Sequence, residues 1–114
     1  MSLSHVVIGA GCSPGDVERI AGNPASGFLI LCDHASNAVP TDLGSLGLPP
    51  EQFQRHIAYD IGAAAMTRGM AAALSCPALL TTCSRLVIDP NRGEDDPTLV
   101  MRLSDGAIVP GNAR

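Results

Sequence analysis

The sequence predicts an α/β fold with parallel strands, and three consecutive segments support that prediction. Residues 27–32 form a continuous apolar run preceded by turn-forming residues, which is typical of a strand buried on both faces. Residues 59–74 are rich in Ala and Met and predict a helix that Pro77 stops. Residues 78–83 are largely apolar and predict a second strand. Strand, helix and strand in this order indicate a βαβ unit with two parallel strands.

The predicted helix has an apolar face made by residues four apart in the chain, which are Gly62, Met66, Met70 and Leu74. A short helical turn is predicted before it, over residues 51–55, because a proline pair precedes that segment. Two strands and one helix are too few layers to cover a parallel sheet on both faces. We therefore expect this 114-residue chain to be a truncated form of a longer one.

The N-terminal segment, residues 1–26, is dense in Gly, Pro, Ser and Asn, and we expect little regular structure in it. We interpret residues 1–22 as a variable leader. Residues 23–114 are then the N-terminal part of a single domain.

The composition limits the possible partners. The net charge is -4, with no cluster of Lys and Arg, which argues against nucleic acid. No stretch approaches the roughly 20 apolar residues of a membrane span, so we expect no membrane partner and a cytoplasmic location. The four cysteines, Cys12, Cys32, Cys76 and Cys83, are irregularly spaced, and we interpret them as reduced thiols.

Polar residues gather where the first predicted strand ends, at Asp33, His34, Ser36 and Asn37. Ligands of open α/β sheets bind beyond the carboxyl ends of the strands. A neutral imidazole there could bind zinc while a neighbouring carboxylate or amide orients it. The alternative is an ordinary turn in which His34 is only solvated.

A second polar cluster lies in residues 84–92. If residues 85–89 are extended, Arg85 and Asp89 stand about 13 Å apart and each needs another partner. Asn91 and Arg92 could present an amide and a guanidinium fork to a carboxylate. The alternative is a surface turn in which Arg92 meets the acidic residues 94–96.

Asp60 stands at the start of the predicted helix, after His56 and Tyr59. It could be a helix N-cap or first-turn acid that complements the helix dipole, or a catalytic carboxylate. His56 reads as an ordinary surface histidine.

Three blocks in the same order resemble the N-formylglutamate amidohydrolase family. They are residues 29–40 (LILCDHASNAVP), 56–63 (HIAYDIGA) and 84–92 (SRLVIDPNR), and a weaker fourth block is 108–112 (IVPGN). The family is similar to the zinc carboxypeptidase and aspartoacylase superfamily. The resemblance therefore implies a mixed, partly parallel sheet flanked by helices, in a zinc carboxypeptidase-like fold.

The resemblance also implies a substrate and a set of site residues. The substrate would be an N-acylated acidic amino acid such as N-formylglutamate, whose hydrolysis releases formate in histidine degradation. His34 would be the first zinc ligand, and Asn37 stands where aspartoacylase-like relatives carry a second, glutamate ligand. Asn91 and Arg92 match the pair that grips the substrate carboxylate, and Arg85 would face the same pocket.

In the implied mechanism, zinc activates a water molecule and polarises the formyl carbonyl, while a carboxylate takes the proton of the water. Asp60 is our candidate for the catalytic carboxylate. The family's later blocks, with a further His ligand and an acid/base carboxylate, have no counterpart before Arg114. The alternative function is therefore a non-catalytic carboxylate-binding or interaction module. The sequence predicts no oligomeric state.

Overall fold

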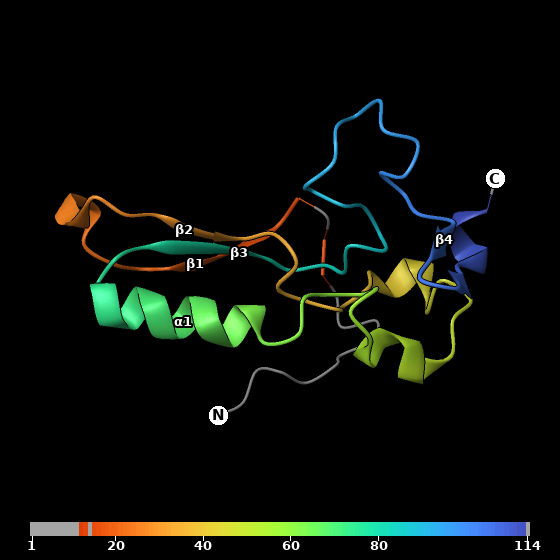
Figure 1. The fold of residues 1–114 in the computed structure, drawn as a ribbon, viewed down its shortest axis with the longest axis horizontal. Helices are drawn as coiled ribbons and strands as arrows, with labels where there is room; N and C mark the ends of the chain where they lie inside the picture. The colour runs from red at the N-terminus through yellow and green to blue at the C-terminus, as the bar shows by residue number, and fades with distance from the viewer. Residues whose placement is uncertain (1–11, 14, 114) are drawn as a thin grey trace.

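The computed structural model describes residues 12–13 and 15–113 of the chain. Its regular part is a three-stranded sheet with one helix against it (Figure 1). The strands β1 (Val17–Ile20), β2 (Ile30–Cys32) and β3 (Ala78–Thr81) lie in the order β1-β3-β2, and α1 (Ala63–Leu74) connects β2 to β3. Strand β2 is parallel to β3 and β1 is antiparallel to it. The predicted α/β fold with a mixed, partly parallel sheet is confirmed.

The sheet and α1 pack through side chains at alternate strand positions. Cys32 pairs in register with Leu80, and both side chains are buried in a cluster with Ala71 of α1. Side chains alternate between the two faces of a strand, so Leu31 and its register partner Leu79 belong to the opposite face. Leu31 is 62% exposed there. The helix therefore covers one face of the sheet and leaves apolar side chains on the other.

Two predicted boundaries are wrong. Residues 1–26 were expected to lack regular structure, yet β1 lies within them and pairs with β3 along its whole length. The helix begins at Ala63 rather than at residue 59, because Gly62 adopts a left-handed backbone (φ 85°) at its N-cap position. The structure does not describe residues 1–11 and 14, so that part of the predicted leader lies outside the described residues.

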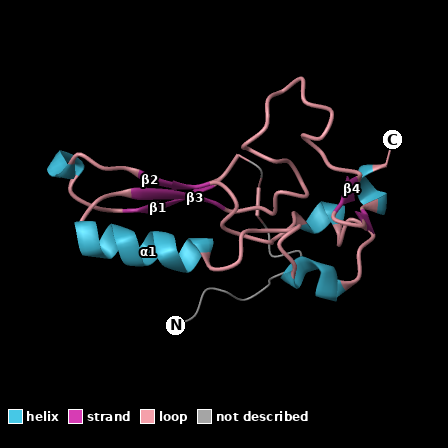
Figure 2. Cartoon of the chain, viewed as in Figure 1, coloured by secondary structure: helices cyan, strands magenta, loops and turns pink. Residues whose placement is uncertain are grey.

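The remainder of the chain is mostly loop (Figure 2). It contains the short 3-10 helices η2 (Thr41–Leu43), η3 (Pro50–Gln54) and η4 (Pro110–Asn112), and a small hairpin of β4 (Leu103–Ser104) and β5 (Ala107–Ile108). A further 3-10 turn, η1 (Pro24–Ser26), precedes β2. The helical turn predicted over residues 51–55 corresponds to η3. The hairpin was not predicted.

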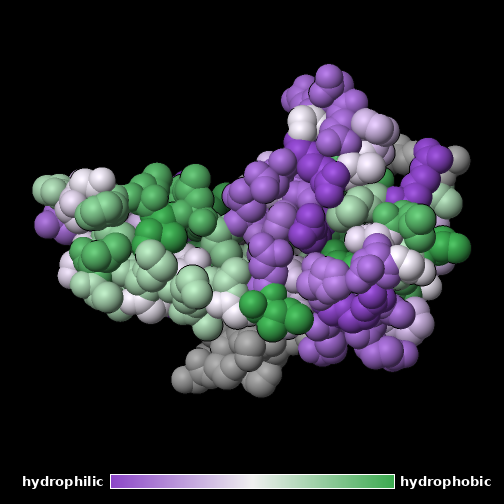
Figure 3. Space-filling view, viewed as in Figure 1, coloured by the Kyte–Doolittle hydropathy of each residue, from purple (hydrophilic) through white to green (hydrophobic). Residues whose placement is uncertain are grey.

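The molecule thus has two parts, which we name by their residues. The sheet-helix layer comprises residues 17–32 and 63–81, and the loop-rich half comprises residues 33–62 and 82–113. Each part has its own cluster of buried hydrophobic side chains. Apolar residues dominate the visible surface over the sheet-helix layer, whereas polar residues dominate over the loop-rich half (Figure 3).

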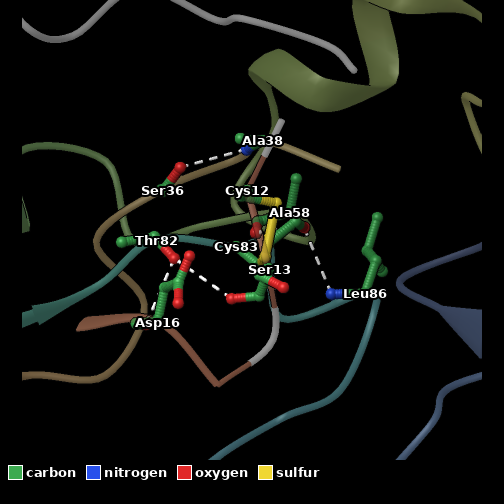
Figure 4. Close-up of a disulfide and its surroundings, with 10 residues drawn as sticks. Cys12, Ser13, Asp16, Ser36, Ala38, Ala58, Thr82, Cys83 and Leu86 are labelled. Atoms are coloured by element: carbon green, nitrogen blue, oxygen red, sulfur yellow. Dashed lines mark hydrogen bonds between the residues drawn. A yellow bond between two sulfur atoms is a disulfide. The ribbon is translucent and has the colours of Figure 1, made fainter. Parts of the chain in front are cut away.

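A disulfide joins Cys12 to Cys83, whose Cα atoms are 5.6 Å apart (Figure 4). The expectation of four reduced thiols is therefore wrong for this pair, although Cys32 and Cys76 are free and buried. The bond is formed because residues 71 positions apart in the chain are neighbours in the fold, which their spacing does not reveal. Thr82 reinforces the contact by donating a 3.2 Å hydrogen bond to the Asp16 carbonyl. The disulfide anchors the N-terminal segment where the sheet-helix layer meets the loop-rich half.

Among the helices that the structure describes, none has the length and apolar character needed to cross a membrane.

Candidate active site

Three segments that are distant in the sequence meet beyond the end of β2. The amide of Asp60 donates a 2.9 Å hydrogen bond to the carbonyl of His34. The amide of Arg85 donates to the carbonyl of Ala58 over 3.2 Å. These bonds between backbone groups fix the segments that carry His34, Asp60 and Arg85 side by side. The structure thus brings polar residues together beyond the carboxyl end of this strand, where the sequence predicted them.

Asp89 is the centre of the polar contacts. Its side chain is fully buried. Its Oδ1 lies 2.7 Å from His34 Nε2 and accepts a 3.0 Å hydrogen bond from the backbone amide of Asn91. Its Oδ2 accepts hydrogen bonds from the guanidinium groups of Arg85 (2.9 Å) and Arg92 (3.2 Å). Both carboxylate oxygens are therefore engaged by donors, as a buried charge requires.

Burial by itself raises the pKa of Asp89, because it disfavours the charged form. Hydrogen bonds from His34, from the Asn91 amide and from Arg92 outweigh that effect and lower the pKa from 3.8 to about 2. Asp89 is thus a permanently ionised carboxylate at neutral pH.

The contact between Arg85 and Asp89 corrects a prediction. Residues 85–89 were expected to be extended, which would separate the two side chains by about 13 Å. Instead the chain turns after Ser84, whose carbonyl accepts a 3.0 Å bond from the Val87 amide. Ser84 also fixes the turn through its hydroxyl, which donates to the Ala58 carbonyl and accepts from the Leu86 amide. The turn places residues four apart close together, and the two charges pair directly.

His34 is buried between two carboxylates with different surroundings. Nε2 faces the fully buried Asp89, whereas Nδ1 lies 3.2 Å from Oδ2 of Asp60, which is 52% exposed. The alternative that His34 is merely solvated is wrong, since the side chain is only 7% exposed. The other oxygen of Asp60 lies 3.5 Å from the guanidinium of Arg85. His34, Asp60, Asp89 and Arg85 therefore form one connected network.

Asp60 is neither the N-cap nor a first-turn residue of α1. The N-cap of α1 is Gly62, and the first turn of the helix contains no acidic residue. The N-cap interpretation of Asp60 is therefore wrong, because the left-handed Gly62 starts the helix two residues after it. His56 is exposed, and its Nε2 lies 3.0 Å from a carboxylate oxygen of Asp105.

Asn37 is buried, and its amide group donates a 2.7 Å hydrogen bond to the carbonyl of Phe53. That bond fastens the segment after β2 to η3. A metal-binding role for Asn37 stays a prediction.

The Asn91 and Arg92 pair lies at the edge of the network. Asn91 is exposed, and Arg92 is held by Asp89 on one side and by the hydroxyl of Thr98 on the other. Thr98 in turn donates to Asp96. The alternative, in which Arg92 meets the acidic residues 94–96, is therefore realised only indirectly, through Thr98. Substrate binding by Arg85, Asn91 and Arg92 stays a prediction.

Sequence reasoning placed Asp89 in a polar cluster but did not select it as a site residue. Its dependence on a partner was visible, since an aspartate in an otherwise apolar run needs a cation or donors. Its partner His34 lies 55 residues away, however, and only the fold brings the two together.

A cavity of about 570 Å³ lies away from this network, between the end of β1 and α1. Its lining includes Arg68, whose guanidinium is neutralised by a two-pronged contact with Glu18 over 2.6 and 2.7 Å. We do not assign the cavity to the chemistry, because the charge of Arg68 is already paired with Glu18. Within residues 12–13 and 15–113, no group of three or more His, Cys, Asp or Glu side chains is arranged to hold a metal ion.

The sequence model of the family described as FGase, N-formylglutamate amidohydrolase, matches residues 26–114. The chain belongs to this family. Among the solved structures, it is similar to the gene product Atu2144 from Agrobacterium tumefaciens, with 30% sequence identity and a TM-score of 0.77. The match covers 90% of this chain and 39% of that one, so the chain spans well under half of its relative. No curated protein matches the chain significantly.

Proposed function

We propose that this segment belongs to a zinc-dependent amidohydrolase that releases formate, or another acyl group, from an N-acylated acidic amino acid such as N-formylglutamate. Membership of the family supports amide hydrolysis in general. The observation that supports the site is the buried His34–Asp89 pair, with two arginines and a half-exposed carboxylate around it. We also propose that the fold is zinc carboxypeptidase-like.

Asp89 is the orienting residue in this proposal. A carboxylate that accepts the N–H of a metal-binding histidine fixes the tautomer and the direction of the other ring nitrogen. The 2.7 Å contact from Nε2 to Asp89 meets that requirement, and burial makes it independent of solvent. Nδ1 of His34 is then the nitrogen left to bind a metal ion.

The donor types beside that nitrogen suit zinc, because imidazole and carboxylate are two of its usual ligands. A bound zinc ion supplies Lewis acidity, which lowers the pKa of a water molecule and polarises the scissile carbonyl. Asp60 is the catalytic carboxylate that we propose. It is 52% exposed and can meet a ligand, whereas Asp89 is sealed from solvent.

Arg92 and Arg85 bind the substrate carboxylate in this proposal, with Asn91 at its edge. Arg92 is suited to the task because Asp89 and Thr98 fix the plane of its guanidinium, and a fixed fork loses little entropy on binding. The remaining guanidinium donors at the surface would pair with a carboxylate. A substrate with a free carboxylate next to the amide would then be preferred over a neutral amide.

A coupled assay of formate release tests the proposal, on the zinc-loaded protein that contains this segment and with N-formylglutamate as substrate. We expect formate and glutamate in equal amounts. Arg92→Lys should lower kcat/KM by about tenfold to a hundredfold, because lysine cannot replace a bidentate fork. Arg102→Lys is the matched control, because Arg102 is exposed just before β4 and its substitution should leave the rate unchanged.

Two other results would change the conclusion. Glutamate binding in calorimetry without any release of acyl group would favour the non-catalytic carboxylate-binding module. If the protein shows no binding and no release, N-acylated acidic amino acids are not its substrate class.

A further inference from the structure

Ser84 contacts the other two segments that carry the candidate site. Its side chain is fully buried, and its backbone amide donates a 2.7 Å hydrogen bond to the carbonyl of Ala38. Its hydroxyl donates a second bond, also of 2.7 Å, to the carbonyl of Ala58. Ala38 follows His34 by four residues, and Ala58 precedes Asp60 by two. One residue therefore connects the segments of His34 and Asp60 to its own.

The Ser84 hydroxyl has a fixed direction. It carries one proton, which the carbonyl of Ala58 accepts, so its lone pairs face the amide of Leu86 at 3.1 Å. The backbone amide of Arg85 donates to the same Ala58 carbonyl over 3.2 Å. Two donors from neighbouring residues thus converge on one acceptor. This convergence fixes the orientation of the chain at the point from which the Arg85 side chain extends.

Arg85 depends on this backbone anchor because its side chain is not fully hydrogen-bonded. Its guanidinium lies 2.9 Å from Asp89 Oδ2 and 3.5 Å from Asp60 Oδ1. Its Nε is buried and has no hydrogen-bond partner among the described residues. A buried donor without a partner is unfavourable, which weakens the hold of the two carboxylates on the side chain. The turn at Ser84 supplies the remaining constraint.

We propose that Ser84 is a positioning residue, whose hydroxyl sets the place of the Arg85 guanidinium and through it the binding of the substrate carboxylate. The inference rests on the proposed function, in which Arg85 and Arg92 bind that carboxylate. Ser84 does not touch the substrate, since its side chain is sealed from solvent. Without the hydroxyl, Asp60 stays bonded to the His34 carbonyl through its own amide. Loss of the hydroxyl should therefore weaken substrate binding and leave the chemical step intact.

Proton–nitrogen NMR of the arginine side chains provides the first test, and it needs no catalytic activity. Ser84→Cys fills the space of the serine but donates only weakly, and Ser84→Ala removes the donor. In both variants of the 114-residue chain, we expect the Nε–H signal of Arg85 to shift or to broaden. Arg92 is the internal control, because it also bonds to Asp89, over 3.2 Å, and its signal should not move. Ser84→Thr keeps the hydroxyl and should keep the Arg85 signal.

Steady-state kinetics of the zinc-loaded protein that contains this segment provide the second test, with N-formylglutamate as substrate. Ser84→Ala should raise KM about fivefold while kcat stays within about twofold, because the lost hydrogen bond positions only a binding group. A variant that is merely destabilised would have a smaller active fraction, which lowers kcat at unchanged KM.

Ser26→Ala is the matched control for the kinetics. It also removes a serine hydroxyl that accepts a bond from a nearby backbone amide, that of Phe28 over 3.3 Å. Ser26 precedes β2, whereas the site lies beyond the end of that strand, so both constants should be unchanged.

The outcomes separate this inference from the function on which it rests. An unmoved Arg85 signal in Ser84→Ala and Ser84→Cys would overturn the positioning role and leave the proposed function untouched. Equal changes at Arg85 and Arg92, or loss of the fold, would make the hydroxyl a general structural group and overturn the role as well. A changed Arg85 signal with an unchanged KM would overturn the link to substrate binding, and with it the role of Arg85 in the proposed function. Absence of formate release by the unaltered protein would contradict the proposed function alone, because the NMR test does not depend on it.

Discussion

The sheet-helix layer and the loop-rich half bury their hydrophobic side chains to different extents. The sheet-helix layer has five buried residues in its cluster, Cys32, Ala71, Cys76, Ala78 and Leu80. The irregular part has ten, among them Phe53, Ile57 and Leu86. Regular secondary structure is therefore not where most of the core lies in this protein.

The loop-rich half can be a core because side chains satisfy its backbone. The amide of Asn112 donates to the carbonyls of Leu86 and Met101, each over 2.8 Å. Asn37 does the same for Phe53. Buried carbonyls must be paired, and these amides replace the partners that a sheet would provide. Polar residues thus hold the irregular core together, and the site network lies among them.

The sheet-helix layer shows the opposite balance. Its backbone is paired by strands and helix, but large apolar side chains stay in solvent, including Phe28 at 59%, Leu31 at 62% and Met66 at 67% exposure. Exposed apolar side chains of this kind mark surfaces against which other structure can pack. Stability should therefore be much more sensitive to substitution in the loop-rich half.

The chain contains two phenylalanines, one in each part, and they provide the strongest test of the comparison. Phe53→Ala should lower the free energy of unfolding by about 3 to 5 kcal/mol, because the ring is fully buried. Phe28→Ala should change it by no more than about 0.5 kcal/mol. Urea denaturation measures both. Equal effects would mean that the loop-rich half is not the main core.

The disulfide links the N-terminal segment to the junction of the two parts. Cys12→Ser should lower the free energy of unfolding by about 2 to 4 kcal/mol, since the bond closes a long loop in the unfolded chain. Reductant should produce the same loss in the unaltered protein and no further loss in the variant. A reductant effect that persists in Cys12→Ser would contradict the assignment of this pair.

Asp89, in the loop-rich half, should make the free energy of unfolding depend on pH. The pKa of its carboxyl is lowered to about 2, so the unfolded chain binds a proton at a higher pH than the folded one. The stabilisation is present above about pH 4 and is lost as the pH falls through 2, and it amounts to about 2 kcal/mol. Denaturation across pH 2 to 7 should show this slope in the unaltered protein.

Asp89→Asn is the variant that should remove the slope, because no ionisable group remains at that position. It should lower the free energy of unfolding at pH 7 by about 3 kcal/mol, since His34, Arg85 and Arg92 lose a buried partner. Asp105→Asn is the control, with an exposed ion pair worth no more than about 1 kcal/mol. An unchanged slope in Asp89→Asn would assign the effect to other carboxylates.

The smallest expected effect concerns a single amide. Asn112→Ala should lower the free energy of unfolding by about 1 to 2 kcal/mol, because it leaves two buried carbonyls without their donor. Asn23→Ala removes only the exposed cap of η1 and should cost about 0.5 kcal/mol. Thermal unfolding resolves this difference. Comparable losses would show that the two buried hydrogen bonds of the Asn112 side chain stabilise the fold no more than an exposed cap does.

The sheet-helix layer was predictable because its signals are local. An apolar run at residues 27–32 and an Ala-rich segment before Pro77 were enough to place β2, α1 and the parallel β3. Strand β1 was missed because its VERI sequence carries charges among apolar residues and lies in a segment rich in turn formers. Its position follows from pairing with β3, which is a tertiary contact.

The sequence selected six candidate site residues by residue type and by resemblance, but it did not predict their contacts. The structure brings His34, Asp60, Arg85, Asn91 and Arg92 together around Asp89. The sixth, Asn37, instead donates a hydrogen bond to the carbonyl of Phe53. The expected separation of Arg85 from Asp89 was wrong, because a turn fixed by the Ser84 hydroxyl replaces the extended chain.

The sequence by itself therefore determined the family, the βαβ order and the residue types that chemistry could use. Tertiary structure decided the Cys12–Cys83 pair, the burial of Asp89 and which carboxylate meets each nitrogen of His34. The physical reason is distance along the chain. Strands and helices follow from the periodicity of neighbouring residues, whereas a buried charge finds partners 55 positions away only when the whole core has folded around it.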